Sequence, residues 1–279
     1  MVTADIRVRV PNVLTIAGTD PSGGAGIQAD IKAFSALGAY GTSVITTLVA
    51  QNTQGVQEIH PIPAGFVKTQ LDVLFADVRI DAVKVGMLGG AEIVHAVAAA
   101  LKQQAPSHVI VDPVMVAKSG DRLLAADAVA VLREEILPHA DLITPNLPEA
   151  ADMLGEEEAT DEQGMLAQVE RLGELCPRVL LKGGHLDGPQ SVDLLLIDGE
   201  VTRLTADRVA TRNTHGTGCT LSAAIAALRP QRPDWISAVS DAKDYLTRAL
   251  AAADRLDVGH GHGPQHHFHA WWPIADEDR

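Results

Sequence analysis

The sequence predicts an α/β protein in which a central, mostly parallel β-sheet is covered by helices on both faces. Apolar runs of strand length alternate with longer segments whose apolar residues recur at helical spacing, which is typical of strand–helix–strand units. Aromatic residues make up only 3% of a chain that is 46% hydrophobic, so Ala, Val and Leu must supply most of the packing. Short aliphatic side chains are typical of strands buried between two helical layers.

The expected strands are short runs rich in Val, Ile and Leu, and the expected helices are the longer segments between them. The strands are expected at 13–17, 44–50, 82–85, 109–111, 142–144, 179–182 and 192–197. The helices are expected at 25–37, 64–76, 91–104, 125–132, 147–154 and 163–175, with a further small-residue helix over 221–227. The acidic stretch 155–163 is expected to be a solvated loop that leads into a helix start.

The chain shows no internal repeat and no Ser/Pro-rich linker, which favours one domain over residues 1–279. Residues 1–11 are expected to form an N-terminal extension. Residues 259–279 are expected to form a C-terminal strap that packs Trp271 and Trp272 onto the body. Five histidines lie between residues 260 and 269, but they lack the carboxylate or thiol partners of a zinc site.

Charge and composition argue against several classes of protein. Acidic residues number 36 against 22 Lys and Arg, and the net charge of −14 argues against a nucleic-acid-binding or anionic-membrane-binding surface. No apolar run is long enough to span a membrane, and the first residues lack the apolar core of a signal peptide. Two cysteines are too few for a disulfide framework, so we expect a reduced, cytoplasmic protein.

Polar and glycine-rich motifs follow one expected strand after another, at 18–24, 51–52, 86–87, 112–115, 145–146 and 183–184. Because ligands of open parallel sheets bind outside the carboxyl ends of the strands, these motifs are expected to share one edge. No GxxxxGK(S/T) motif occurs, which excludes a P-loop, and the glycines of 18–26 lack the spacing of a dinucleotide site. The segment 18–26 is therefore either a tight strand-to-helix turn or a turn whose backbone closes over a flat substrate.

The most informative stretch is Asn213-Thr214-His215-Gly216-Thr217-Gly218-Cys219-Thr220, which runs directly into the expected helix 221–227. The two glycines permit a tight turn, and the helix start leaves several backbone N–H groups unpaired. The helix dipole adds to them, so a phosphate is the expected guest.

Cys219 lies in the same turn. A helix start is expected to lower the pKa of its thiol, which could then take a proton from a substrate hydroxyl. The other interpretation is a small buried hydrophobic residue. Cys176 has no such surroundings and is expected to be structural.

Three groups at strand ends could form a metal site. Asn146 and Glu149 are spaced as a capping box, but they also stand one helical turn apart and could hold a hydrated Mg²⁺. Asp112 adds a further carboxylate at another strand end. Lys182, which closes a strand, is either solvated or a point charge for phosphate oxygens.

Four motifs together resemble the bacterial hydroxymethylpyrimidine/phosphomethylpyrimidine kinase family of thiamine biosynthesis, in the ribokinase-like superfamily. They are AGTDPSGGAGIQAD at 17–30, NLPE at 146–149, KGGH at 182–185 and GTGC at 216–219. The resemblance extends from about residue 13 to residue 272 and implies a ribokinase-like three-layer α/β/α fold. It also implies ATP as co-substrate, Mg²⁺, and two successive phosphorylations, of 4-amino-5-hydroxymethyl-2-methylpyrimidine and then of its monophosphate.

The resemblance also implies roles at the matching positions. It assigns catalysis to Gly216, Thr217, Gly218 and Cys219, and substrate binding to Gly18, Asp30, Gln51, Met87 and Val114. It assigns ATP binding to Asn146, Lys182 and Thr214, and a water-mediated Mg²⁺ site to Asp112 and Glu149. Sugar kinases of the superfamily carry Asp at the position of Cys219, whereas a thiol could stay neutral beside an anionic second substrate.

Three alternatives remain open at this point. A pyridoxal kinase would act on a similarly flat ring, whose aldehyde could add to Cys219. A non-catalytic pyrimidine-binding sensor fits less well with the intact Lys182, Asp112 and Glu149, and a thiol redox protein fits less well because no Cys-x-x-Cys pair occurs. A homodimer is expected, and residues 23–26 and 118–120 are candidate hinges of a lid over the substrate.

Overall fold

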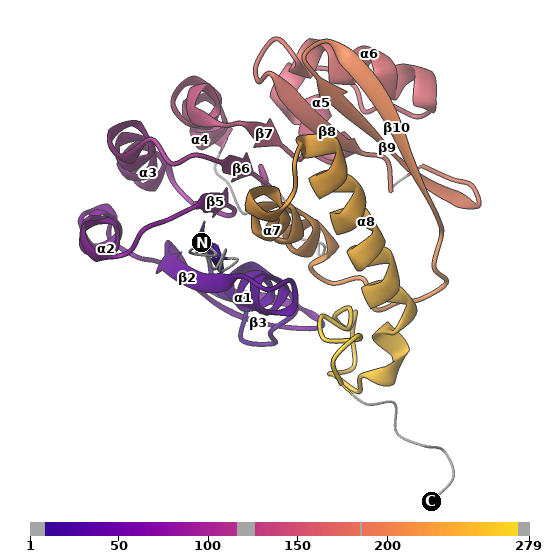
Figure 1. Cartoon of the computed structure of the whole chain (residues 1–279), viewed down its shortest axis with the longest axis horizontal. Helices are drawn as coiled ribbons and strands as arrows, with labels where there is room; N and C mark the ends of the chain where they lie inside the picture. Colours follow the sequence, from indigo (N-terminus) through magenta and orange to yellow (C-terminus); the bar gives the residue numbers. More distant parts are fainter. Residues whose placement is uncertain (1–8, 116–125, 185, 273–279) are drawn as a thin grey trace, which may run out of the picture.

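The computed structural model describes residues 9–115, 126–184 and 186–272, which are built around an eight-stranded sheet (Figure 1). The strand order is β10-β9-β8-β7-β6-β5-β1-β2, in which β9 is antiparallel to both β8 and β10 and the other neighbours pair in parallel. The strands are β1 (Asn12–Ala17), β2 (Tyr40–Ile45), β5 (Ala82–Val85), β6 (Val109–Val111), β7 (Leu142–Ile143), β8 (Arg178–Lys182), β9 (Gln190–Ile197) and β10 (Glu200–Asp207). An antiparallel hairpin of β3 (Thr47–Asn52) and β4 (Gly55–Pro61) is separate from this sheet.

Helices cover both faces of the sheet, as the sequence predicts. Alternate strand residues point to opposite faces, so in β6 Val109 and Val111 pack into one core and Ile110 packs into the other. The first core is closed by α2 (Ala64–Asp77), α3 (Ala91–Gln104), α4 (Ala126–Val131), α5 (Leu147–Leu154) and α6 (Glu162–Leu172). The second is closed by α1 (Gly26–Ala36), α7 (Thr217–Leu228) and α8 (Trp235–Ala251). This is the three-layer α/β/α arrangement.

The expected strand at 44–50 is wrong, because the chain leaves the sheet in the middle of that run. Thr46 lies between β2 and β3, and its buried hydroxyl donates a hydrogen bond to the Met87 carbonyl at 2.8 Å. The residues after it pair with β4 instead, and this hairpin carries Gln51 out over the carboxyl edge of the sheet. The strand β10 and the helix α8 were not among the expected elements either.

The C-terminal strap is held chiefly by polar residues and not by its tryptophans. Gln265, His266 and His267 are buried, whereas Trp271 and Trp272 are 69% and 52% exposed. The expectation that both rings pack onto the body is therefore wrong for most of their surface. The strap pairs with two parts of the carboxyl edge: the His262 N–H donates to the Thr53 carbonyl at 2.9 Å, and the His215 N–H donates to the Gly263 carbonyl at 3.1 Å.

No helix within the described residues is long and apolar enough to cross a lipid bilayer.

The central helix α7 is buried along almost its whole length, from Thr220 to Leu228. It packs between the sheet and the helices α1 and α8, and its alanines at 223, 224, 226 and 227 have no exposed surface. Larger side chains would not fit without moving the sheet. The small-residue segment therefore lets the start of α7 reach the carboxyl edge of the strands.

Replacing Ala224→Leu should lower the free energy of unfolding by about 2 kcal/mol or more, because the added methylenes have no space. Urea unfolding followed by circular dichroism measures this change. The matched control is Ala99→Leu on the exposed face of α3, which should change stability by less than about 0.5 kcal/mol. Equal losses in the two variants would contradict the packing argument.

Candidate active site

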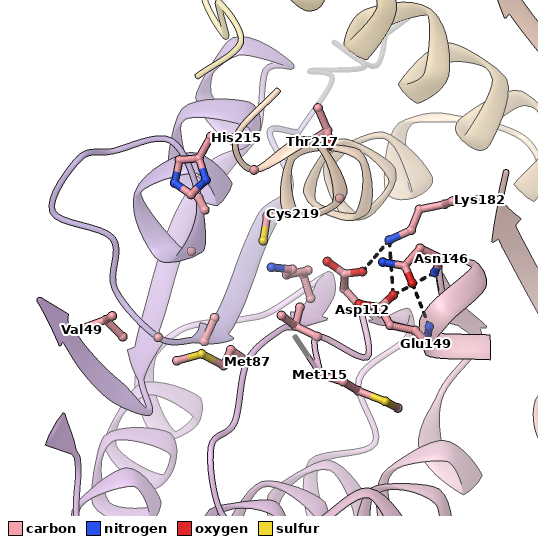
Figure 2. Close-up of a pocket in the computed structure, with 18 of the residues that line it drawn as sticks. Val49, Met87, Asp112, Met115, Asn146, Glu149, Lys182, His215, Thr217 and Cys219 are labelled. Carbon is pink, nitrogen blue, oxygen red and sulfur yellow. Dashed lines mark hydrogen bonds and ion pairs between the residues drawn. The ribbon is translucent and has the colours of Figure 1, made fainter. Parts of the chain in front are cut away.

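A cavity of about 720 Å³ lies where the carboxyl ends of β1, β5, β6 and β8 meet the start of α7 (Figure 2). The predicted site residues that line it are Gly18, Gln51, Met87, Asp112, Val114, Asn146, Glu149, Lys182, Thr214, Gly216, Thr217, Gly218 and Cys219. These positions come from segments far apart in the sequence. Their proximity follows from the parallel sheet, which ends its strands along one edge.

Asp30 is the exception among the predicted residues. Its side chain has no exposed surface, and its oxygens accept hydrogen bonds from Lys84 and Thr15 behind the cavity wall. Asp30 is therefore not among the residues that line the cavity, and its recognition of a pyrimidine stays a prediction. Residues 118–120 and His185 lie outside the described residues.

The start of α7 has the geometry of an anion site. Gly216 precedes the helix with φ +79°, and a Cβ there would overlap the Gly24 carbonyl oxygen, so only glycine fits. The first intrahelical hydrogen bond runs from the Thr220 N–H to the Gly216 carbonyl at 2.9 Å. The N–H groups of the preceding turn therefore have no acceptor within the helix, and an anion can bind them.

Hydrogen bonds to the buried Asp20 fix this turn against the loop after β1. Asp20 accepts hydrogen bonds from the N–H groups of Gly24 and Ala25 at 3.0 and 2.7 Å, and from the His215 ring at 2.8 Å. Burial by itself raises the pKa of Asp20, but His215, Ser22 and Ala25 hold it well below its usual range. Asp20 therefore links the loop after β1 to the turn before α7. The spacing of residues in the sequence motif did not reveal this role.

An ion pair also spans the floor of the cavity. The Lys182 ammonium lies 3.0 Å from one Asp112 oxygen and 3.9 Å from a Glu149 oxygen. Asp112 further accepts hydrogen bonds from Thr144 and Ser222, at 3.1 and 3.3 Å. Although burial acts in the other direction, Lys182 and Lys84 lower the pKa of Asp112. The floor therefore carries an ionised carboxylate and a cation side by side.

Asn146 and Glu149 form a complete capping box at the start of α5, so the structural interpretation of this pair is confirmed. The Glu149 N–H donates to Asn146 Oδ1, and the Asn146 N–H donates to Glu149 Oε2, both at 2.8 Å. Both side chains nevertheless line the cavity beside Lys182. Burial raises the pKa of Glu149 to about 7, although Lys182 opposes this, so its carboxylate is poorly compensated and suited to a further cation.

Cys219 faces the cavity from the first turn of α7 (Figure 2). The expectation that its position lowers the thiol pKa is wrong for the protein alone. Burial raises the pKa of Cys219 to about 11, with Asp112 and Asp30 adding to the effect and Lys84 and the Gly26 N–H opposing it. Cys219 is therefore a neutral thiol at pH 7. Cys176 is buried, and its Sγ donates to the Ala140 carbonyl at 3.5 Å, which is the structural role expected for it.

Lys84 also lines the cavity and was not singled out from the sequence. Lys84 lies inside the apolar strand β5, where a single charge gives no sign of whether it faces solvent or the interior. Its full burial is visible only in the structure.

The chain is similar to known proteins over nearly all of its length. The family model described as phosphomethylpyrimidine kinase matches residues 20–266. The hydroxymethylpyrimidine/phosphomethylpyrimidine kinase of Escherichia coli (strain K12) is 60% identical over 262 residues, covering 94% of this chain and 98% of the relative.

Two solved structures extend the comparison. An ADP complex of Bacillus subtilis pyridoxal kinase has a TM-score of 0.86 and 33% identity, covering 93% of this chain and 98% of its own. The phosphomethylpyrimidine kinase of Clostridium difficile 630 has a TM-score of 0.76 and 40% identity, covering 86% of this chain and 99% of its own.

Replacing Asp20→Asn should lower the free energy of unfolding by about 3 kcal/mol at pH 7, because a buried charged acceptor of several hydrogen bonds is lost. The lowered pKa of Asp20 stabilises the native protein above the unfolded-state pKa, and this stabilisation is lost as pH falls through the acid range. The gap between wild type and variant should therefore shrink below about pH 4. Urea unfolding at a series of pH values measures it.

The matched control is Asp161→Asn, an exposed helix cap whose oxygen accepts from the Gly164 N–H. Asn caps a helix about as well as Asp, so stability should hardly change. A constant gap for Asp20→Asn between pH 7 and pH 3 would contradict the assignment of the charge.

Proposed function

The chain belongs to the phosphomethylpyrimidine kinase family and is a kinase of thiamine biosynthesis, and we propose that its carboxyl-edge cavity performs two successive phosphorylations. The first acceptor is the hydroxyl of 4-amino-5-hydroxymethyl-2-methylpyrimidine, and the second is the resulting monophosphate. ATP is the phosphate donor in both. The observation that carries the proposal is that a thiol, a helix-start anion site and a Lys182–Asp112 pair share one cavity in a chain of this family.

The acceptor ring fits the end of the cavity formed by Gly18, Gln51 and Met87. A Cβ at Gly18 would overlap the Met87 methyl, so this glycine keeps the backbone open to a flat ligand. The Gln51 amide offers both a donor and two acceptor lone pairs, which match an aminopyrimidine edge. Met87 and Val114 supply the apolar contacts that such rings need.

The transferred phosphate fits the start of α7, where Gly216, Thr217 and Gly218 present their backbone. Lys182 lies close to this turn, since a Cβ at Gly218 would be 3.2 Å from its ammonium. Asn146 and Thr214 line the same side of the cavity and would face the nucleotide. Positioning and charge neutralisation of this kind supply most of the catalysis of phosphoryl transfer.

The residues fit a hydrated Mg²⁺ held by Asp112 and Glu149. Such an ion usually keeps several waters and needs only one or two protein carboxylates, so this pair is sufficient. The raised pKa of Glu149 marks a buried carboxylate whose ionised form needs a further positive charge. When bound, Mg²⁺ neutralises phosphate oxygens of the nucleotide.

A thiol at position 219 suits an enzyme whose two acceptors differ in charge. The monophosphate has a second pKa near 6 and is largely dianionic at neutral pH. A carboxylate at this position would repel it, whereas burial keeps Cys219 neutral, with a pKa of about 11. In the first phosphorylation the acceptor is an uncharged hydroxyl, and a base that removes its proton assists the reaction.

Mass spectrometry of a reaction with MgATP and hydroxymethylpyrimidine tests the function directly. The diphosphate should appear after a lag during which the monophosphate accumulates. If the monophosphate is the final product, the proposed second phosphorylation is wrong. If the folded protein phosphorylates neither acceptor, the whole proposal is wrong. Pyridoxal belongs in the same experiment, because the Bacillus subtilis pyridoxal kinase structure is so similar; we expect slower turnover on it.

Cys219→Ala should slow the first phosphorylation by about 100-fold or more, the scale of a lost general base, and slow the second by less than about tenfold. Cys219→Asp should impair the second phosphorylation more than the first, because it places a carboxylate beside the anionic monophosphate. Each step is measured separately, with the purified acceptor and saturating MgATP. Equal losses in both steps for both variants would contradict the proposed role of the thiol.

We also propose that the enzyme is a homodimer. The strand β2 is an edge of the sheet, and the adjacent helix α2 exposes Phe66 and Val73 by 59% and 67%. Tyr40 on β2 is 63% exposed, so apolar side chains gather on this side of the protein. A monomer in sedimentation velocity at micromolar concentration would refute this assembly.

The two cysteines are both free thiols, and the proposed chemistry requires Cys219 to stay reduced. We therefore place the enzyme in a reducing compartment, for which the cytoplasm is the natural candidate.

A further inference from the structure

Lys84 and Asp30 form a buried ion pair beneath the cavity. The Lys84 ammonium donates to both Asp30 oxygens, at 3.0 and 2.8 Å, and the Thr15 hydroxyl donates to Asp30 at 2.5 Å. All three side chains have no surface exposed to solvent. Only Lys84 borders the cavity, so the cation stands between the pair and the site.

Stability does not explain this pair. Burying two charges costs so much desolvation that well-packed apolar residues of similar size are often as stabilising or more so. The surroundings are also shaped for the cation, because a Cβ at Gly86 would lie 2.7 Å from the Lys84 nitrogen. The glycine after β5 leaves the space that the ammonium fills.

The sulfur of Cys219 is the group that this cation favours in its charged form. Lys84, Gly26 and Cys219 line the same cavity. Lys84 lowers the pKa of the thiol, and the Gly26 N–H at the start of α1 also lowers it. Asp112 and Asp30 act in the opposite direction, and Lys182 of β8 lines the same cavity. A nearby cation and a helix-start N–H are the features that stabilise a thiolate in proteins.

Lys84 keeps its charge in this setting. Burial by itself lowers the pKa of a lysine, but the Asp30 carboxylate, with Asp112, raises that of Lys84 above its usual range. Asp30 therefore keeps a permanent cation in place beside the cavity.

We propose that Lys84 is a positioning residue of the kinase, oriented by Asp30 and Thr15 so that its ammonium stabilises negative charge on the Cys219 sulfur. In the first phosphorylation the Cys219 thiol first releases its own proton to solvent, and the thiolate that forms accepts the proton of the acceptor hydroxyl. The hydroxyl oxygen forms a bond to the γ-phosphorus of ATP, the bond from that phosphorus to the bridging oxygen breaks, and ADP leaves. This inference rests on the proposed function, because it concerns the same thiol and the same reaction.

The test measures the reactivity of Cys219 without using the kinase activity. Iodoacetamide alkylates thiolates, so peptide-level mass spectrometry gives the rate at Cys219 as a function of pH. Cys176 in the same digest reports unfolding, because it is buried and structural. The test variant is the double substitution Asp30→Asn/Lys84→Met, which removes both charges and leaves no unpaired buried ion. Lys84→Gln is a second variant, in which an amide can still donate to Asp30.

A second buried pair supplies the control. Lys243 and Asp193 join α8 to β9 with a nitrogen–oxygen distance of 2.5 Å, and neither lines the cavity. Asp193→Asn/Lys243→Met removes a comparable ion pair and should not change the pH dependence of the alkylation rate of Cys219.

Loss of Lys84 should move the alkylation profile of Cys219 up by about one pH unit, or slow it about tenfold at fixed pH, while Cys176 stays protected. The first phosphorylation should slow by about tenfold or more, and the second should change less. If the pH dependence of Cys219 alkylation is the same in both Lys84 variants as in the wild type, the inference is wrong, even if the wild type phosphorylates both acceptors. If the Lys84 variants shift the pH dependence of Cys219 alkylation but the wild type phosphorylates neither acceptor, the electrostatic role of Lys84 stands and the proposed function is refuted.

Discussion

The Asp112 carboxylate joins elements that the chain brings to the carboxyl edge of the sheet from far apart. It follows β6, and its donors come from β8, from the end of β7 and from α7: Lys182, Thr144 and Ser222. A carboxylate that is 98% buried needs such partners, because an unpaired charge in this position would cost several kcal/mol. The partners in turn fix the geometry of the cavity, since the start of α7 and the end of β8 are both held against the same group.

Charges alternate in sign along the floor of the cavity. Each charged side chain in this row interacts with the next one. The row runs from Asp30 of α1 to Lys84 of β5, to Asp112 after β6, to Lys182 of β8 and to Glu149 of α5. Each cation thus interacts with two carboxylates. Burial raises the pKa of Glu149 at one end of this row, which is the end where the proposed Mg²⁺ would bind. The opposite end is the Asp30–Lys84 pair, in which both Asp30 oxygens accept hydrogen bonds from Lys84.

The sequence predicts the sheet and its functional edge well, because parallel strands between two helical layers are short and strongly apolar. The helix α3 and the strand β6 are predicted to the residue. The hairpin is missed because β4 is almost entirely exposed and shows no apolar alternation. The helix α8 does carry a helical spacing of buried residues, at Trp235, Ala238, Val239 and Ala242, so this element could have been found.

The site is predicted less completely for a different reason. Glycines, a helix start and strand-end carboxylates mark the cavity from local sequence alone. Pairings between distant side chains leave no such mark: Lys84 and Asp30 are 54 residues apart, and Asp20 and His215 are 195 apart. Both pairs surround the predicted motifs. The thiol pKa of Cys219 was expected to fall and instead rises, chiefly because the side chain is buried, which the local sequence does not show.

The proposed mechanism requires one cavity to hold both the acceptor ring and the nucleotide phosphates. A crystal structure with MgADP and hydroxymethylpyrimidine bound would locate both. We expect the ring between Gln51 and Met87, its hydroxyl within hydrogen-bond reach of Cys219, and the nucleotide phosphates between Lys182 and the start of α7. A ring bound outside this cavity, or phosphates placed away from Gly216–Gly218, would contradict it.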